Sequence, residues 1–348
     1  MSTPVRIGIV GAGGIVRSEH IPRFRAIDGV TVVAVANRTP ASSRRAAAEL
    51  GIGRSFDDWR ALVADPAIDA ILVGAWPYLH APVTIEALGA GKHVLTEARM
   101  AATGDDARAM LRASRARPDL VAMVVPASFS LWADATIARL LANRAIGRLR
   151  HARVAWDASG HDDPAEAWRW QRRYSGENVM ALGILYEAMA RWFGPATAVT
   201  AVTRSGRPVR PGPDGDIEVD IPDHVLAIVE FPDDVTATIE MSTRTNPLES
   251  NRAILYGTEG TLRVDLAERR IDRAPHGGDW APVEIDDADR AGWSAEIDFV
   301  AAIRGERPVT LTDFATGAHY MAVVEAVDRS AAHGRREPVG SVEREKGP

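Results

Sequence analysis

The residues best suited to chemistry lie near the start of the chain, where Gly11, Gly13 and Gly14 follow the apolar stretch Val5–Val10. Gly11 permits a tight turn, and Gly13 lets the backbone approach a pyrophosphate. The amides of Gly14 and Ile15 then open a helix whose positive N-terminal end attracts phosphate. Three glycines alone are a weak motif. A strand before them and a helix after them make the motif typical of a dinucleotide-binding turn.

The next apolar stretch, Val32–Ala36, ends in Asn37-Arg38-Thr39 rather than in an acidic residue. A site selective for NAD usually has Asp or Glu at this point, where the carboxylate binds the ribose 2′-hydroxyl. Asn37 and Thr39 can donate hydrogen bonds to a 2′-phosphate, and Arg38 can pair with its charge. These three residues therefore favour NADP(H) over NAD(H).

The length, net charge and composition of the chain limit the classes of protein to which it can belong. The chain has 348 residues, enough for two domains with substantial cores, and its net charge of -6 argues against a nucleic-acid partner. No apolar run reaches the length of a membrane span, and the N-terminus leads directly into a strand, so neither a membrane segment nor a signal peptide is expected. The chain has no cysteine, which fits a cytoplasmic protein. The nine histidines lack ligand spacing, so no metal site is predicted.

Strands and helices are predicted to alternate through residues 1–125. Short apolar stretches are separated by stretches of helical length, which is the pattern of a parallel, doubly wound (Rossmann) sheet. The later strands are expected at 70–74, 93–96 and 120–125, and the helices near 41–50, 56–64, 81–90 and 104–116. Residues 1–125 are therefore predicted to form an NADP-binding α/β domain.

From about residue 150, strands follow one another with little helix between them, which is typical of an antiparallel sheet. They are expected at 151–156, 198–204, 225–231, 235–243, 252–257 and 261–265, with helices near 179–193, 293–304 and 313–333. The stretch 205–220 is rich in Gly, Pro and Asp and is predicted to be a surface loop. Residues 126–340 are thus predicted to form an α+β domain with a large, open, mainly antiparallel sheet.

Four further stretches accompany these elements, namely 76–80, 91–97, 145–149 and 296–308. With the glycine turn, their order and spacing resemble the glucose–fructose oxidoreductase, inositol dehydrogenase and rhizopine-catabolism (Gfo/Idh/MocA) family over nearly the whole chain. The resemblance implies a Rossmann domain followed by a domain that binds a small-molecule substrate. The open sheet of that second domain commonly forms an oligomer interface in the family, so a homodimer or homotetramer is implied.

Three polar groups of the family are missing. The family glutamate, here Glu97, is usually followed by Lys-Pro, and the lysine contacts the nicotinamide ribose and the substrate; this chain has Ala98 and Arg99. The family also places Asp and His four residues apart on one helix face, where this chain has Ala181 and Leu185. A helix face without an acid or base cannot move the proton that alcohol oxidation releases. The chain is therefore expected to be an atypical member.

The resemblance also suggests roles for several individual residues. Trp76, His80 and Glu97 are predicted to contact the cofactor, with a buried structural role as the alternative for His80. The predicted substrate contacts are Arg99, Trp168, Asn178 and Leu185. Arg99 is as readily interpreted as a surface residue.

Three side chains are candidates for the missing proton donor. Tyr186 could reach the site from the side of its helix, and the alternative is a core tyrosine. His161 could form an acid–base pair with Asp157 or Asp163, and Tyr174 offers a hydroxyl on the same grounds, although loop polarity also explains these residues. Glu187 is expected to be a solvated charge.

Two classes of function follow. The first is an NADP(H)-dependent oxidoreductase that reduces an imine or a carbonyl, or oxidises a sugar-like alcohol, with a non-standard proton donor. A protonated imine accepts hydride without an acid supplied by the protein. The second is a non-redox protein that binds NADP for a structural, sensing or partner-control role.

Overall fold

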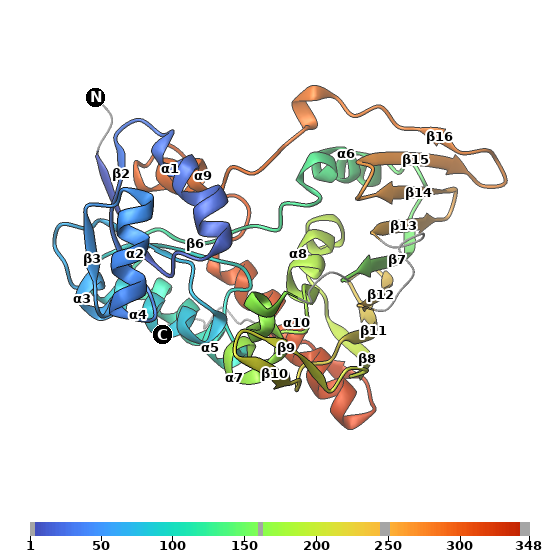
Figure 1. Ribbon diagram of the computed structural model, residues 1–348. Helices are drawn as coiled ribbons and strands as arrows, with labels where there is room; N and C mark the ends of the chain where they lie inside the picture. Colours follow the sequence, from blue (N-terminus) through green and yellow to red (C-terminus); the bar gives the residue numbers. More distant parts are fainter. Residues whose placement is uncertain (1–3, 159–162, 244–250, 342–348) are drawn as a thin grey trace, which may run out of the picture. The chain divides into compact units, whose positions relative to one another are not determined.

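The computed structural model describes residues 4–158, 163–243 and 251–341 (Figure 1). The chain divides into two compact units. Unit 1 comprises Met1–Pro126, Arg173–Gly176 and Ser294–Met321, and unit 2 comprises Ala127–Arg172, Glu177–Trp293 and Ala322–Pro348. The sequence prediction placed both returning segments in the second domain, because nothing in their composition shows which sheet they pack on.

Unit 1 contains a six-stranded parallel sheet in the order β3-β2-β1-β4-β5-β6. Its strands are β1 (Val5–Val10), β2 (Val30–Ala36), β3 (Arg54–Phe56), β4 (Ala70–Val73), β5 (His93–Thr96) and β6 (Ala122–Val124). All four residues of β4 are buried, as expected for a strand covered on both faces. The order reverses between β1 and β4, so the predicted doubly wound fold is confirmed.

Helices cover both faces of this sheet. They are η1 (Val16–His20), α1 (Ile21–Arg25), α2 (Pro40–Leu50), α3 (Trp59–Val63), η2 (Pro77–Leu79), α4 (His80–Gly89), α5 (Gly104–Arg115), most of α7 (Arg172–Ser175), α9 (Ala295–Ile303) and the start of α10 (Phe314–His333). α1 contacts α9, while α3, α4 and α5 contact one another in succession. Figure 1 shows α1 and α9 above the strands and α4 and α5 below them.

The outer edge of β6 is partly covered by the returning C-terminal segment of unit 1. The amide of Val124 donates to the carbonyl of Thr312 at 2.9 Å, and Met123 forms a β-bridge with Asp313. An unpaired strand edge can pair with another chain, and these two residues block part of it.

The helix after the glycine turn approaches the sheet although Val16 stands where a third glycine usually allows close packing. Val16 is fully buried, and it is the first residue of the π-helical turn η1. The room comes from the end of β4, because a Cβ on Gly74 would lie 2.3 Å from Val16 Cγ2 and 2.6 Å from the Gly11 carbonyl oxygen. The small residue required for close packing is therefore on the neighbouring strand.

Replacing Gly74 by alanine is expected to destabilise the protein by about 1–3 kcal/mol, because the new methyl group overlaps Val16 and the Gly11 backbone. Urea-induced unfolding measures this loss. Adding Val16→Ala should recover part of it, since that change relieves only the side-chain overlap. An unchanged unfolding midpoint in Gly74→Ala would contradict this account of the packing.

Unit 2 contains a nine-stranded mixed sheet in the order β16-β15-β14-β13-β7-β12-β11-β8-β17. Its strands are β7 (Leu149–Asp157), β8 (Ala198–Arg204), β11 (His224–Glu230), β12 (Thr236–Ser242), β13 (Arg252–Gly257), β14 (Gly260–Asp265), β15 (Arg270–Pro275), β16 (Ala281–Pro282) and β17 (Glu337–Pro338). β7 and β12 are parallel, and the other neighbours are antiparallel. The predicted large, mainly antiparallel sheet is confirmed.

The helices of unit 2 include one that the sequence prediction did not assign, α6. They are α6 (Leu131–Ala142), η3 (Pro164–Trp170), α8 (Leu182–Phe193), η5 (Asp287–Asp289) and the remainder of α10. The inner face of the sheet packs on α8 and α10. Tyr186 stacks on Phe231 at a ring distance of 6.2 Å, and Ser330 Oγ accepts a hydrogen bond from the Ala201 amide at 2.8 Å. No helix within the described ranges has both the length and the apolar composition needed to cross a bilayer.

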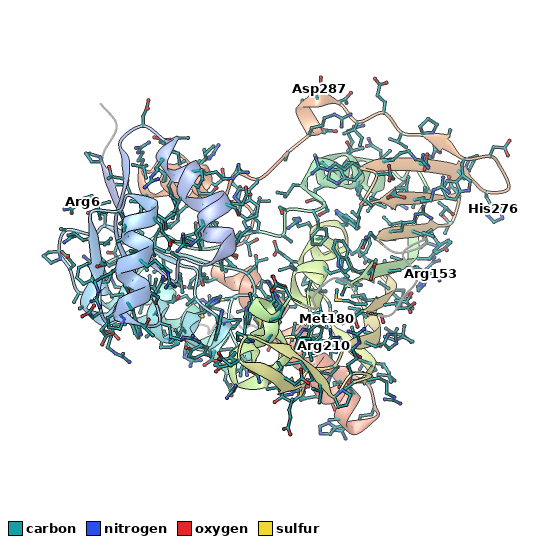
Figure 2. All side chains as sticks on the ribbon, viewed as in Figure 1. Arg6, Arg153, Met180, Arg210, His276 and Asp287 are labelled. Atoms are coloured by element: carbon teal, nitrogen blue, oxygen red, sulfur yellow. The ribbon has the colours of Figure 1, made fainter. Side chains whose placement is uncertain are left out.

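The predicted surface loop at 205–220 is instead a hairpin of β9 (Val209–Gly212) and β10 (Gly215–Glu218). Its Arg210 is buried, with the guanidinium 3.8 Å from the centre of the Trp170 ring and Nη2 3.5 Å from Asp223 Oδ2 (Figure 2). A cation stacked on an aromatic face and paired with a buried carboxylate anchors the hairpin. Composition alone does not reveal this contact.

Candidate nucleotide site

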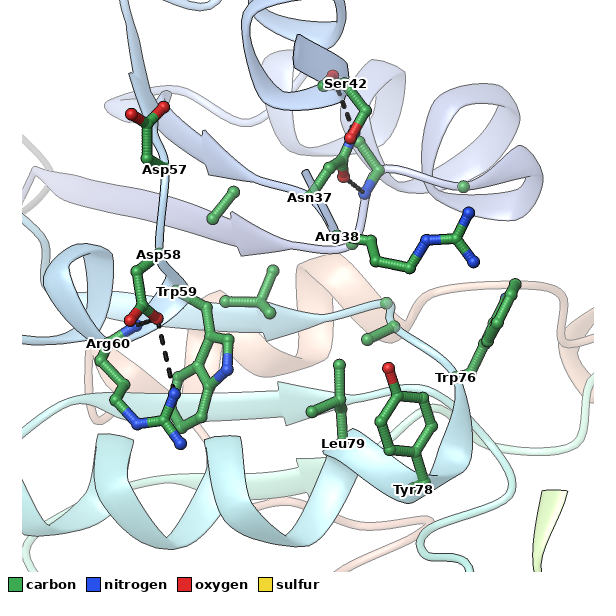
Figure 3. Close-up of a pocket in the computed structure, with 17 residues that line it drawn as sticks. Asn37, Arg38, Ser42, Asp57, Asp58, Trp59, Arg60, Trp76, Tyr78 and Leu79 are labelled. Atoms are coloured by element: carbon green, nitrogen blue, oxygen red, sulfur yellow. Dashed lines mark hydrogen bonds and ion pairs between the residues drawn. The ribbon is translucent and has the colours of Figure 1, made fainter. Parts of the chain in front are cut away.

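A cavity of about 570 Å³ opens in unit 1 beside the carboxyl ends of β1, β2 and β4 (Figure 3). Its walls are Val10, Gly11, Ala12, Gly13, Ala36, Asn37, Arg38, Ser42, Asp57, Asp58, Trp59, Arg60, Gly74, Ala75, Trp76, Tyr78 and Leu79. The cavity lies where the strand order reverses, which is the place where doubly wound sheets bind dinucleotides.

The glycine turn has the geometry that close approach to a phosphate requires. Gly11 has φ +91, and a Cβ there would lie 2.5 Å from the Ala75 nitrogen, so no larger residue fits. An added Cβ on Gly13 or Gly14 would meet nothing within 4 Å, so their backbone faces open space. Gly14 and the exposed Ile15 open the helix as predicted, although neither lines the cavity. The turn therefore fits a dinucleotide pyrophosphate.

The residues after β2 take three different roles. Asn37 Oδ1 accepts a hydrogen bond from the Ala12 amide at 2.8 Å, and its Nδ2 donates to the Ser42 carbonyl at 3.1 Å. Thr39 Oγ1 accepts from the Ser42 amide and caps α2. The Thr39 hydroxyl also donates to Ser42 Oγ at 2.9 Å, which corrects its predicted role as a donor to a phosphate. Asn37 uses one of its two Nδ2 hydrogens within the protein, and its contact with a phosphate stays a prediction. Arg38 is exposed and lines the cavity.

An aromatic cluster borders the same cavity. The Arg38 guanidinium lies 5.3 Å from the Trp76 ring, and Figure 3 shows it extending toward that ring and away from Asp57 and Asp58. The rings of Trp76 and Tyr174 pack in an edge-on arrangement, with their centres 4.8 Å apart. Tyr174, a predicted proton donor, comes from one of the segments that return to unit 1 and packs behind two residues of the cavity wall, Trp76 and Tyr78.

The cavity also includes acidic residues that the sequence prediction missed. Asp58 accepts a hydrogen bond from the Arg60 amide at 2.9 Å and caps α3, and Asp57 lies 3.2 Å from Arg44. Both carboxylates therefore have partners within the protein. Their loop follows a three-residue strand that carries too little pattern to be recognised from sequence.

His80, a predicted cofactor contact, is buried and holds two loops together. Its Nε2 lies 2.8 Å from the Ala75 carbonyl oxygen, and its Nδ1 lies 3.0 Å from the Arg99 carbonyl oxygen. Burial lowers the pKa of His80, against the opposing effects of the Ala75 carbonyl and the Glu97 charge. With both ring nitrogens facing backbone oxygens, His80 has the structural role that was the alternative interpretation.

Glu97 lies at the end of β5 in a buried triad with His20 and Glu296. His20 Nε2 is 2.5 Å from Glu97 Oε1, and Nδ1 is 2.6 Å from Glu296 Oε1. The His20 side chain is fully buried, whereas 13% of the Glu97 side chain is exposed. The sequence prediction missed His20 and Glu296 because their partners are distant in the chain.

The two carboxylates keep His20 protonated. Burial by itself lowers the pKa of His20, but the hydrogen bonds to Glu296 and Glu97 and the charges of both raise it to about 9. The ring is therefore an imidazolium near neutral pH and donates from both nitrogens. Since the carboxylates bind opposite nitrogens, they do not converge on a common point. Among the described residues, no three or more His, Asp or Glu side chains form a group suited to a metal ion.

The predicted substrate contacts are divided between the units. Arg99 is 4% exposed, which corrects its interpretation as a surface residue. In unit 2, Asn178 and Leu185 are buried, and the Trp168 ring lies 4.6 Å from the Arg169 guanidinium. Of the three positions predicted to lack the polar groups of the family, Ala98 belongs to unit 1, and Ala181 and Leu185 belong to unit 2.

Of the candidate proton donors, Tyr186 is placed in the core. The hydroxyl of Tyr186 accepts a hydrogen bond from the Ala196 amide at 2.8 Å, and burial raises the pKa of Tyr186, so it is a core tyrosine rather than a catalytic one. Glu187 is buried 2.7 Å from Arg191 and is not solvated as predicted. His161 lies outside the described residues.

Family comparison confirms the class that the fold and the cavity define. Residues 5–124 match the model for the oxidoreductase family with an NAD-binding Rossmann fold, and residues 135–263 match the GFO/IDH/MocA C-terminal domain. The chain belongs to the Gfo/Idh/MocA family of oxidoreductases.

Several relatives are sugar dehydrogenases or reductases by name. Levoglucosan dehydrogenase of Pseudarthrobacter phenanthrenivorans is 28% identical over 76% of this chain and 74% of its own length. The 1,5-anhydro-D-fructose reductase of Ensifer adhaerens is 31% identical over 74% of each chain. The dTDP-3,4-didehydro-2,6-dideoxy-alpha-D-glucose 3-reductase of Streptomyces antibioticus is 30% identical over 76% of this chain and 77% of its own.

Solved structures share the fold. Levoglucosan dehydrogenase in complex with NADH and L-sorbose superposes with a TM-score of 0.83 at 23% identity, covering 97% of this chain and 99% of that chain. The aldose-aldose oxidoreductase of Caulobacter crescentus, complexed with glycerol, gives a TM-score of 0.80 at 25% identity, covering 96% and 99% of the two chains.

Proposed function

We propose that this protein is an NADP(H)-dependent oxidoreductase that reduces a carbonyl or imine group of a small molecule. The observation that carries the cofactor choice is Arg38, an exposed cation that lines the cavity directly after β2. No carboxylate follows this strand to repel a 2′-phosphate. A guanidinium matches the geometry and charge of a phosphate group.

The residues of unit 1 suit each part of such a cofactor. The open backbone at Gly13 and Gly14 would hold the pyrophosphate, and Arg38 with Ser42 would border the 2′-phosphate. When bound, the cofactor supplies the hydride that reduces the substrate. The reductive direction is supported by two relatives that are named as reductases of sugar derivatives.

The proton donor must differ from the usual family group, because Ala98, Ala181 and Leu185 carry no titratable side chain. A protonated imine accepts hydride without an acid from the protein, and a carbonyl can take its proton from water. The lack of a titratable side chain at these three positions also favours the second candidate function, that of a protein that binds NADP without redox turnover.

One experiment separates these possibilities. Calorimetry with NADPH and NADH measures cofactor choice, and absorbance at 340 nm follows NADPH in the presence of a panel of carbonyls and imines. We expect NADPH to bind more tightly than NADH and to be consumed with at least one substrate. Equal affinity for both nucleotides would overturn the cofactor assignment. Tight binding without turnover across the panel would favour the non-redox candidate.

We also propose that the protein forms a homodimer or homotetramer through the outer face of the unit 2 sheet. Leu226 and Val202 are opposite each other on β11 and β8, and both are 46% exposed; Ile228 beside them is 47% exposed. Adjacent apolar side chains on one sheet face are typical of an interaction surface.

Leu226→Glu is therefore expected to shift the molecular mass in solution, measured by light scattering, toward the 37.5 kDa of one chain. Its matched control is Val209→Glu, because Val209 is 48% exposed but lies on the separate β9–β10 hairpin. A wild-type protein that is already monomeric would contradict this proposal.

A further inference from the structure

The buried triad of His20, Glu97 and Glu296 lies next to the wall of the nucleotide cavity. The Glu97 amide donates to the Val73 carbonyl at 2.9 Å, and the residue after Val73, Gly74, lines the cavity. His80 extends the connection, since its ring contacts the carbonyls of both Ala75 and Arg99. The triad and the cavity thus share the loops that follow β4 and β5.

The triad, beside the ends of β4 and β5, lies where one end of a bound dinucleotide would be. The ribose of the adenosine half binds at the end of β2, and the dinucleotide crosses the point where the strand order reverses. The nicotinamide half must therefore lie on the side of β4 and β5. Glu97 directly follows β5 and is the one member of the triad with an exposed side chain.

The triad carries a net negative charge. An imidazolium between two carboxylates leaves one negative charge, whichever of the three groups holds the shared proton. His20 and Glu296 are enclosed, so water screens this charge poorly except at Glu97. Glu97 is close enough to oppose the lowering of the His80 pKa by burial, and the His80 ring contacts the carbonyl of Ala75, which lines the cavity.

We propose that this triad presents a fixed negative charge to the nicotinamide end of the site and makes the protein bind the oxidised nucleotide in preference to the reduced one. The oxidised ring is positively charged and the reduced ring is neutral, so a nearby negative charge distinguishes them. Glu97 carries the charge toward the site, and His20 and Glu296 are positioning residues. The inference rests on the proposed function and deepens it.

Tighter binding of the oxidised nucleotide than of the reduced one favours reduction of the substrate. Glu97 would place its negative charge beside a ring that is positive once it has given a hydride to the substrate carbon. The triad would therefore stabilise the state after transfer and the transition state that leads to it. The triad would thereby aid catalysis in a protein that lacks the usual polar groups of its family.

Nucleotide binding tests the inference without a known substrate. Calorimetry at pH 7 gives the Kd for NADP⁺ and for NADPH in wild type, Glu97→Gln and Glu296→Gln. We expect the ratio Kd(NADPH)/Kd(NADP⁺) to fall roughly tenfold in each variant, because each removes one negative charge. The control is Glu19→Gln, which removes a half-buried carboxylate that is next to His20 in sequence but paired with Arg23, and it should leave the ratio unchanged.

A double variant separates charge from structure. His20→Gln/Glu296→Gln removes one positive and one negative charge, so Glu97 keeps the net charge and the ratio should stay within about twofold of wild type. If Glu97→Gln fails to fold, Glu296→Gln and this double variant decide the question in the same way.

Unchanged ratios in the single variants, with both nucleotides still bound, would overturn the inference and leave the proposed function intact. A wild-type protein that binds neither NADP(H) nor NAD(H) would overturn the proposed function itself.

Discussion

Replacing Arg38 by glutamate is expected to weaken NADP⁺ binding by roughly a hundredfold while NAD⁺ binding is kept or improved. The change removes a charge-assisted hydrogen bond to the 2′-phosphate, worth about 1.5–3 kcal/mol, and adds a repelling carboxylate. The same carboxylate can accept hydrogen bonds from the 2′-hydroxyl of NAD⁺. Calorimetric titration of both nucleotides measures the change in preference.

Two variants serve as controls for this prediction. Arg38→Lys keeps the charge without the two-pronged geometry, so the loss should be smaller. Arg60→Glu introduces the same charge change at the Asp58 side of the cavity, where Arg60 packs on Trp59, and should affect both nucleotides alike. If Arg38→Glu left the ratio of the two affinities unchanged, Arg38 would not be the residue that selects the phosphate.

The wild-type protein is expected to lose up to about 3 kcal/mol of stability as the pH rises from 6.5 through 9. His20 has a pKa raised from 6.5 in the unfolded chain to about 9 in the folded state, so the folded protein holds this proton more tightly. The stabilisation is complete below pH 6.5, and it disappears as the pH passes 9. Urea-induced unfolding at pH 6, 8 and 9.5 measures the slope.

The variant His20→Gln should lose this pH dependence and should be destabilised at pH 7 by about 3–5 kcal/mol, because two buried carboxylates then lack their cation. His276→Gln is the matched control, since His276 is exposed after β15, at the end of a hairpin (Figure 2). An equal slope between pH 6.5 and 9 in wild type and His20→Gln would show that another group titrates.

The regular elements were predictable because their signals are local. β5 and most long helices lie within a few residues of their expected positions, since apolar runs and helix-length spacing identify each element without its neighbours. The hairpin at Val209–Glu218 was missed, because its anchor is the contact of Arg210 with Trp170, forty residues earlier. Contacts of that kind leave no periodic pattern.

The residues of the candidate site also fall into those that the local sequence predicts and those whose roles depend on distant partners. Gly11, Gly13 and Arg38 line the cavity as expected, because backbone requirements and strand ends determine their roles locally. Glu97 was singled out, but its partners were not: His20 is 77 residues away, and Glu296 contacts the other nitrogen of that histidine. Asn37 also has a role in the turn that the sequence did not reveal, since its Oδ1 accepts a hydrogen bond from the Ala12 amide.

The divided make-up of unit 1 has a consequence for the order in which the chain is made. When β6 leaves the ribosome, Glu296 and the residues that cover the β6 edge, Thr312 and Asp313, have not been synthesised. The emerging unit then contains a His20–Glu97 pair without its second carboxylate and a sheet with an open edge, which is a form prone to pairing with other chains. We expect the buried triad and the covered β6 edge to be completed late in translation, after most of unit 2 has already appeared, although every residue that lines the cavity is made early.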